Sequence, residues 1–546
     1  MSTRKLLRTR WGTARIAGTA AAGALGGFLA LAAGSCRGGD AGPQRHTIID
    51  SRDTYDPRSL DPAHANDIPS GRLVAYLYDG LLRFDPDGSL RPDLASRWET
   101  SADGRTYTFH LRQGVKFHDG TPFSAAAVVH SFARALAPKT HGVPLWPLLP
   151  IAGAREFAAG AASSLSGVVA QDDSTVTITL REPLGVFPKL LAMPVASIVP
   201  LSVPPGDGNT LSEHPIGTGP WRLASWKHDD YVRLARNADY FGGAPKIDSL
   251  EARIIPEKST AVAEFESGNV DVLYIPEAET RDWVQTDEKK ALIQSTPALR
   301  LWYMAINTTH GPLADARVRR AMNEAIDRRT ILDQMLSGRG ALAAGVIPPS
   351  LPGADSARRA YPYDPADAKR LLAAAGHPGG INVELWVSQE PPWPRLAETV
   401  QGYLQGVGIR ARIVQRDASS MREAARNGKT DLVLKDWYAD YPDAENFLYP
   451  LLHSANAGVG GNVSFYANPE FDRLVSAARG QTDEARRNAL YRQADDIEFH
   501  DAPMVYLFFY NELYAVQPWI TGFQVPAVFN AQRWIDVGFG GNPGAQ

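Results

Sequence analysis

Residues 94–123 read LASRWETSADGRTYTFHLRQGVKFHDGTPF, and the fold assignment starts from this stretch. Inside it, Arg105–Leu111 alternates apolar with polar side chains, the period-two pattern of a strand with one buried face. Segments with similar alternation or β-branched content recur on both sides of it. We predict strands at Thr47–Ile49, Arg105–Leu111, Thr175–Leu180, Tyr231–Ala235, Ile381–Trp386 and Asp431–Lys435.

Helical stretches alternate with these strands. In Asp315–Leu336 the apolar positions recur at helical spacing, with arginines and acids between them. Pro365 directly after Asp364 suits a helix start, and Gly376 suits its end. A mixed αβ order over about 500 residues implies more than one core, hence an α/β fold with lobes and a cleft between them. The predicted helices are Asp315–Leu336, Pro365–Ala375, Arg395–Leu404 and Thr482–Ile497.

The composition excludes several classes of protein. Of the 546 residues, 44% are hydrophobic and 21% charged, which argues against collagen-like, disordered and polytopic membrane proteins. The 56 basic and 60 acidic residues give a formal charge of -4, which argues against a surface that coats nucleic acid. A single cysteine excludes intramolecular disulfides and cysteine-based zinc or iron–sulfur sites.

The first 35 residues have the layout of a secretory signal. A basic head without acids precedes an Ala/Gly/Leu-rich run from Ile16 to Ala33. Cys36, the only cysteine, follows small residues and resembles the lipobox cysteine of bacterial lipoproteins, although Ala33 stands where leucine is usual. We therefore expect export, a lipid anchor at Cys36 and a tether over residues 36–45. A single transmembrane anchor and ordinary cleavage near the same place are the alternatives.

Motifs of common enzymes are missing from the sequence. It has no G-x-x-x-x-G-K-[ST] phosphate loop, no H-E-x-x-H and no G-x-S-x-G. The twelve histidines are scattered without metal-ligand spacing. We therefore expect a binding protein with no catalytic residues, no metal and no cofactor.

Several longer segments, in one order along residues 46–540, carry a family resemblance. They are Ser59–Pro62, Tyr78–Leu82, Leu94–Glu99, Tyr107–Arg112, Gly114–Phe123, Pro215–Trp221, Arg236–Asn237 with Tyr240–Phe241, Ala316–Ala321 and Asp436–Pro442. These segments resemble the extracellular solute-binding proteins of the peptide/nickel class, which feed ABC importers, and above all the bacterial periplasmic oligopeptide-binding proteins. One departure is Ala127, where the family commonly has an acid.

The resemblance implies a two-lobed, three-domain periplasmic-binding-protein-like fold that closes over a ligand. It implies a monomer that docks on ABC permease subunits and touches the membrane only through its lipid anchor. The expected boundaries are 46–78, 203–295 and 508–546 for domain I in lobe 1, 79–202 for domain II, and 296–507 for domain III, which is lobe 2.

The resemblance also implies a peptide site. An extended peptide must have its backbone paired, because a buried unpaired N–H or C=O costs about 1–3 kcal/mol. Asn66-Asp67-Ile68 resembles an early strand that pairs with the ligand backbone, and Trp437-Tyr438-Ala439 resembles the opposing segment. Asp440 matches the aspartate that binds the α-ammonium group, although a turn aspartate is the alternative from sequence alone. Tyr303 and Trp393 are candidate aromatic contacts, with a core position as the alternative for each.

The binding of the ligand's carboxylate is where the chain departs from oligopeptide-binding relatives. Leu434 and Ala425 stand at or near places where those relatives have arginines. Arg416, Arg422 and Lys435 are possible substitutes. We expect an oligopeptide receptor; the alternatives are a murein peptide, a nickel chelate, a sugar or another cationic solute on the same fold, and, more remotely, a hydrolase.

Overall fold

The computed structural model describes residues 46–540 apart from 207 and 459. The predicted signal sequence, tether and Cys36 lie outside the described residues. The stretch quoted above forms a hairpin whose second strand buries Tyr107, Phe109 and Leu111, as its alternation predicts. The hairpin belongs to a four-stranded antiparallel sheet in the order β4 (Ala95–Thr100), β5 (Thr106–Leu111), β7 (Thr175–Thr179) and β6 (Val168–Asp172).

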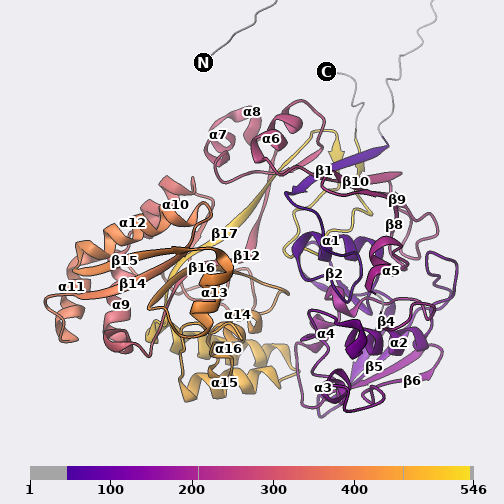
Figure 1. Ribbon diagram of the computed structural model, residues 1–546, viewed down its shortest axis with the longest axis horizontal. Helices are drawn as coiled ribbons and strands as arrows, with labels where there is room; N and C mark the ends of the chain where they lie inside the picture. The colour runs from indigo at the N-terminus through magenta and orange to yellow at the C-terminus, as the bar shows by residue number, and fades with distance from the viewer. Residues whose placement is uncertain (1–45, 207, 459, 541–546) are drawn as a thin grey trace, which may run out of the picture. The chain divides into compact units, whose positions relative to one another are not determined.

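A mixed sheet of eleven strands runs through the described part of the chain. Its two longest strands pair with each other in antiparallel fashion, and Figure 1 shows them lying side by side. In spatial order the strands are β15 (Ile409–Arg416), β14 (Ile381–Ser388), β16 (Leu432–Tyr438), β12 (Ile293–Ile306), β17 (Met504–Val516), β11 (Val272–Tyr274), β1 (Thr47–Asp53), β10 (Ser249–Ile254), β9 (Tyr231–Arg236) and β8 (Trp221–Lys227), with β13 (Gly340–Leu342) paired to β17.

Helices cover both faces of the β14–β16 end of this sheet (Figure 1). The helices on one face share an apolar core with the even-numbered residues of β12, such as Trp302 and Met304. The helices on the other face share a core with odd-numbered residues such as Tyr303. The first set is α9 (Ala316–Ala325), α10 (Arg328–Met335), α11 (Pro365–Ala374) and α12 (Trp393–Gly406); the second is α13 (Ala418–Arg426), α14 (Glu445–Leu452), α15 (Pro469–Arg479) and α16 (Glu484–Asp501).

The other elements are short. They are the helices α1 (Ile68–Leu77), α2 (Ala125–Leu136), α3 (Ala154–Ala158), α4 (Phe187–Leu190), α5 (Gly208–Glu213), α6 (Lys258–Glu266), α7 (Thr280–Gln285) and α8 (Asp287–Lys290), and the strands β2 (Leu82–Phe84), β3 (Leu90–Pro92), β18 (Ile520–Thr521) and β19 (Gly538–Phe539).

The prediction of one continuous helix over Asp315–Leu336 is wrong, because the structure has two helices there. The chain leaves the helix at Ile326, which is extended, and a second helix starts after Asp327. The Asp327 carboxylate caps that helix by accepting hydrogen bonds from the Thr330 N–H (3.0 Å) and hydroxyl (2.7 Å). Apolar periodicity continues across the break, so it does not reveal two helices.

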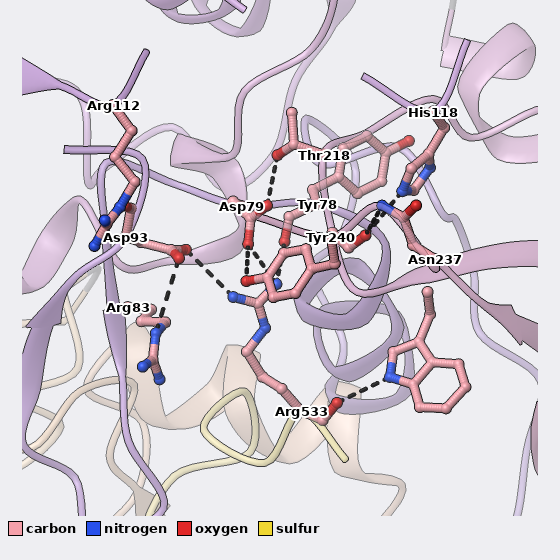
Figure 2. A network of polar contacts seen from close by, with 12 residues as sticks. Tyr78, Asp79, Arg83, Asp93, Arg112, His118, Thr218, Asn237, Tyr240 and Arg533 are labelled. Carbon is pink, nitrogen blue, oxygen red and sulfur yellow. Dashed lines mark hydrogen bonds and ion pairs between the residues drawn. The ribbon is translucent and has the colours of Figure 1, made fainter. Parts of the chain in front are cut away.

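Several of the segments that carry the family resemblance meet in one buried polar network (Figure 2). Asp79 accepts hydrogen bonds from Thr218 (2.6 Å), Tyr240 (3.1 Å) and Arg533. Asp93 lies 3.3 Å from Arg533, and burial together with Asp79 raises the pKa of Asp93 to about 8. The network therefore joins the N-terminal segments to the C-terminal one.

Two glycines of the same motifs allow this close packing. A Cβ atom on Gly217 would lie 2.1 Å from the Leu77 carbonyl oxygen, and one on Gly219 would lie 2.4 Å from that of Tyr76. Only glycine fits such an approach.

No helix among the described residues is both long and apolar enough to span a membrane.

Candidate ligand-binding site

Strand β16 and the residues after it place side chains on two opposite sides. Successive residues of a strand point to opposite faces, so Trp437 and Tyr438 diverge. Trp437 lines a cavity of about 410 Å³, and Tyr438 lines another of about 260 Å³. Ala439, fully buried, donates its N–H to the Leu299 carbonyl at 2.8 Å and so holds the end of the segment against β12.

Asp440 lines the larger of these cavities, here called the Asp440 cavity. Its N–H donates to Asn446 Oδ1 at 2.9 Å, and its side chain makes no ion pair within the described part of the chain. Burial raises the pKa of the Asp440 carboxyl to about 6. Apolar and aromatic side chains make up much of the wall, including Trp146, Pro150, Leu184, Val186, Leu190, Trp437 and Tyr449.

Arg479, the basic side chain among the residues that line this cavity, already has an acidic partner. Arg479 pairs with buried Glu445 at 2.7 Å and stacks 3.5 Å from the centre of the Tyr449 ring. Tyr441 donates its hydroxyl hydrogen to the same glutamate. Asp440 is therefore left as a carboxylate without a cation, and such a group can accept an ammonium group from a ligand.

The smaller cavity, here called the Glu512 cavity, lies on the Tyr438 side. Its charged side chains include Arg300, whose Nε donates to Asp436 at 2.8 Å, and Glu512. Both Arg300 and Glu512 belong to the long strands β12 and β17.

The early segment predicted to pair with a ligand is not a strand. Asp67 caps helix α1, accepting from the Ser70 N–H at 3.0 Å and from its hydroxyl at 2.8 Å. Asn66 precedes the cap and is exposed. Ile68, the first residue of the helix, lines the Glu512 cavity. Aspartate followed by Ile-Pro-Ser is typical of a helix start. The family resemblance instead predicts a strand here, and that prediction is wrong.

Tyr303 and Trp393 line neither cavity. Tyr303 is 1% exposed and faces the core, and its hydroxyl has no hydrogen-bond partner among the described residues. Trp393 is the first residue of α12, and the centre of its ring lies 4.6 Å from the centre of the Trp302 ring. The structure thus gives both aromatic residues a packing role.

The three basic candidates for the ligand's carboxylate lie in different settings. Arg416 and Arg422 are exposed, and Arg416 lies over the Trp386 ring. Lys435 shares the strand face of Trp437, and burial lowers the pKa of its amine to about 8. Among the described residues it has no ion-pair partner.

Asn446, Arg300 and Glu512 were missed by the sequence analysis. Asn446 follows Asp440 by six residues and meets it only through the conformation of the intervening turn, which no residue pattern marks. Arg300 reaches the site only through the pairing of β12 with β16. The sequence could have indicated Glu512, because an acid within the apolar run Met504–Val516 is unusual and points to a functional role. In the described ranges, no three His, Cys, Asp or Glu side chains gather as metal ligands would.

Comparison with known proteins places the chain in a family. Residues 89–459 match the bacterial extracellular solute-binding proteins, family 5, middle region. Heme-binding protein A of Haemophilus influenzae is 33% identical over 448 residues, or 79% of this chain and 81% of that protein. Glutathione-binding protein GsiB of Salmonella typhi is 32% identical over 476 residues, or 86% of this chain and 90% of that protein.

Solved structures agree with this assignment. HbpA2 from Haemophilus parasuis superposes with a TM-score of 0.78 at 30% identity, covering 90% of this chain and all of that one. The ABC transporter-associated periplasmic binding protein DppA from Helicobacter pylori, in complex with the peptide STSA, superposes with a TM-score of 0.74 at 27% identity. The match covers 90% of this chain and 98% of that one. Fold, cavities and sequence together show that the chain belongs to family 5 of the bacterial extracellular solute-binding proteins of ABC transporters and has their two-lobed α/β fold.

Proposed function

We propose that this chain is an extracytoplasmic receptor that captures oligopeptides and delivers them to the permease of an ABC importer. The observation that carries the proposal is the Asp440 carboxylate, which faces a cavity of about 410 Å³ and has no ion-pair partner among the described residues. In this role Asp440 binds the α-ammonium group of the ligand, and Trp437 packs against the adjacent part of the peptide.

The free edge of β16 supports backbone pairing. Strand β14 pairs with β16 only at Leu432 and Val433, whereas β12 pairs with it up to Tyr438. Residues 434–438 therefore have one edge to which no other described strand is paired. An extended peptide can add to such an edge, which gives affinity that does not depend on its side chains.

Binding would take place by closure of the lobes without covalent chemistry. We place the boundaries at 46–78, 203–295 and 508–546 for domain I, 79–202 for domain II and 296–507 for domain III. Strands β12 and β17 cross between these regions and are the candidate hinge. The protein in this proposal is a monomer that is held to the membrane by a lipid on Cys36 and is not an enzyme.

A mixed peptide pool separates the proposal from its alternatives. Purified protein is incubated with the pool, and the retained species are identified by mass spectrometry. Intact retained peptides support a peptide receptor, whereas cleaved products indicate a hydrolase. If no peptide is retained, the site takes another solute of the kinds that the relatives' names describe, such as heme or glutathione.

An aspartate variant tests the anchor itself. Asp440→Asn should lower peptide affinity at least a hundredfold while the protein stays folded by circular dichroism. The control is Glu423→Gln, which removes an exposed acid on α13 and should bind normally. Unchanged affinity in Asp440→Asn would remove the site assignment.

A further inference from the structure

Glu512 is a buried acid, with only 7% of its surface exposed. Within the described part of the chain no hydrogen bond or ion pair reaches its carboxylate, and Arg300 and Arg339 act on it only through space. It lies on β17 opposite Thr296 of β12 and lines the cavity of about 260 Å³. An unpaired carboxylate at this depth costs several kcal/mol, so it either takes up a proton or receives a cation.

The arginines around the cavity already have acidic partners. Arg72 pairs with Asp53 at 2.6 Å, and Arg300 pairs with Asp436 at 2.8 Å. Arg52 likewise pairs with Asp50 at 2.6 Å. Glu512 is therefore the acid in excess among the groups that line this cavity or pair with its lining.

Arg339 lies behind Glu512 and does not line the cavity. Its guanidinium donates to the main-chain carbonyls of Asn511 (2.9 Å) and Ile275 (2.7 Å) and to the Thr280 hydroxyl (3.1 Å). Burial is the largest effect on the pKa of Glu512 and raises it, while Arg300, then Arg339 and Arg72, lower it through space.

Aromatic rings complete the cavity wall. Tyr55, Tyr438 and Phe529 line it, and Tyr55 is 49% exposed. The faces of aromatic rings attract cations, by about 0.5–2 kcal/mol each. A carboxylate with aromatic neighbours suits an ammonium or guanidinium group better than a neutral or acidic one.

The edge of β16 connects this cavity to the proposed peptide site. A peptide added at residues 434–438 would point alternate side chains to the two faces of the sheet. One face carries Trp437 and the Asp440 cavity, and the other carries Tyr438 and the Glu512 cavity. A ligand whose amine lies at Asp440 can thus send a side chain to Glu512.

From this arrangement we infer that the Glu512 cavity is a specificity subsite for a basic side chain of the ligand, so that the receptor prefers peptides carrying lysine or arginine at one position. The inference rests on the proposed peptide-binding function. It assigns Glu512 as the group that receives the side-chain cation.

Matched tripeptides test the inference by calorimetry. Lysine is placed in turn at each position of an alanine tripeptide, and each peptide is compared with its norleucine counterpart, which has the same length but no charge. We expect lysine to bind at least tenfold tighter than norleucine at one position, and Glu512→Gln to abolish that difference while the norleucine peptides keep their affinity. Glu423→Gln is the matched control and should keep the preference.

The outcomes separate this inference from the peptide-binding proposal. If lysine and norleucine peptides bind equally at every position, or glutamate peptides bind tighter, the Glu512 subsite is refuted and the peptide receptor stands. If no tripeptide binds, n-butylammonium is compared with n-butanol by thermal shift. Stabilisation by the cation that disappears in Glu512→Gln supports the subsite, and no difference between the two probes overturns it.

Discussion

Asp440 links ligand binding to pH at the scale of a single residue. Burial raises the pKa of its carboxyl to about 6, so the free site is ionised above that pH and protonated below it. The amino terminus of a peptide stays charged up to a pKa of about 8. Peptide affinity should therefore be constant between pH 6.5 and 7.5 and fall up to tenfold per unit below pH 6.

Calorimetry between pH 4.5 and 7.5 measures this dependence. Asp440→Asn should bind weakly and show no step near pH 6. A flat profile in the wild-type protein would mean that no carboxylate with a raised pKa receives the amine.

The sequence predicted some of the cavity-lining residues but not others. Asp440 and Trp437 line a cavity, whereas Tyr303 lies in the core and Trp393 packs against it, and ligand contact by any of them stays a prediction. A tyrosine in an alternating strand can face either side, and the alternation alone does not say which side holds the ligand. The lack of a partner at Glu512 depends on every neighbouring side chain, so no local pattern reveals it.

At the scale of elements, the break between α9 and α10 depends on one cap. Asp327→Ala removes the hydrogen bonds to Thr330 and should lower the free energy of unfolding by about 1 kcal/mol. Urea denaturation measures the change. Asp333→Ala on the same helix is the control and should have little effect, because its contact with Arg329 is long (3.9 Å) and exposed. Equal effects of the two variants would contradict the assignment of the cap.

Most elements could be predicted from sequence, and the failures have a common cause. The strand after Arg105 and the helix after Pro365 follow from their own side-chain patterns. The segment at Asn66–Ile68 was predicted as a strand from resemblance, against the capping signal of Asp67. The interrupted helix after Asp315 was missed because both halves bury apolar residues in the same core.

At the scale of the whole molecule, Arg533 connects the C-terminal segment to Asp79 and Asp93. Arg533→Met leaves buried Asp79 without its cation and leaves Asp93 only the longer contact with Arg83 (3.8 Å), so it should cost about 3–5 kcal/mol of unfolding free energy at pH 7.5. Because the pKa of Asp93 is about 8, this carboxyl is already largely protonated at pH 7.5, and we expect most of the loss to come from Asp79.

Thermal and urea unfolding test this prediction. Arg236→Met, which breaks the exposed ion pair with Asp248, is the control and should cost at most about 1 kcal/mol. If Arg533→Met lowers the free energy of unfolding no more than this control does, the network does not hold the segments together.

The family and the ligand differ in how far sequence reveals them. Several of the motifs that identify the family build the buried network around Asp79 (Figure 2). Gly217 and Gly219, in one of these motifs, pack closely against neighbouring backbone. The motifs specify the scaffold, and family relatives with the same scaffold carry names for different ligands. Ligand choice lies instead in the side chains that line the two cavities, and only the folded structure brings those together.

The most direct test of the peptide receptor compares one retained peptide with its N-acetylated form. Calorimetry on the wild-type protein at pH 7.5 gives both dissociation constants. Acetylation removes the charge that Asp440 is proposed to bind, so the acetylated peptide should bind at least a hundredfold more weakly, and Asp440→Asn should remove most of that difference. Equal affinity of the two forms for the wild-type protein would contradict the account.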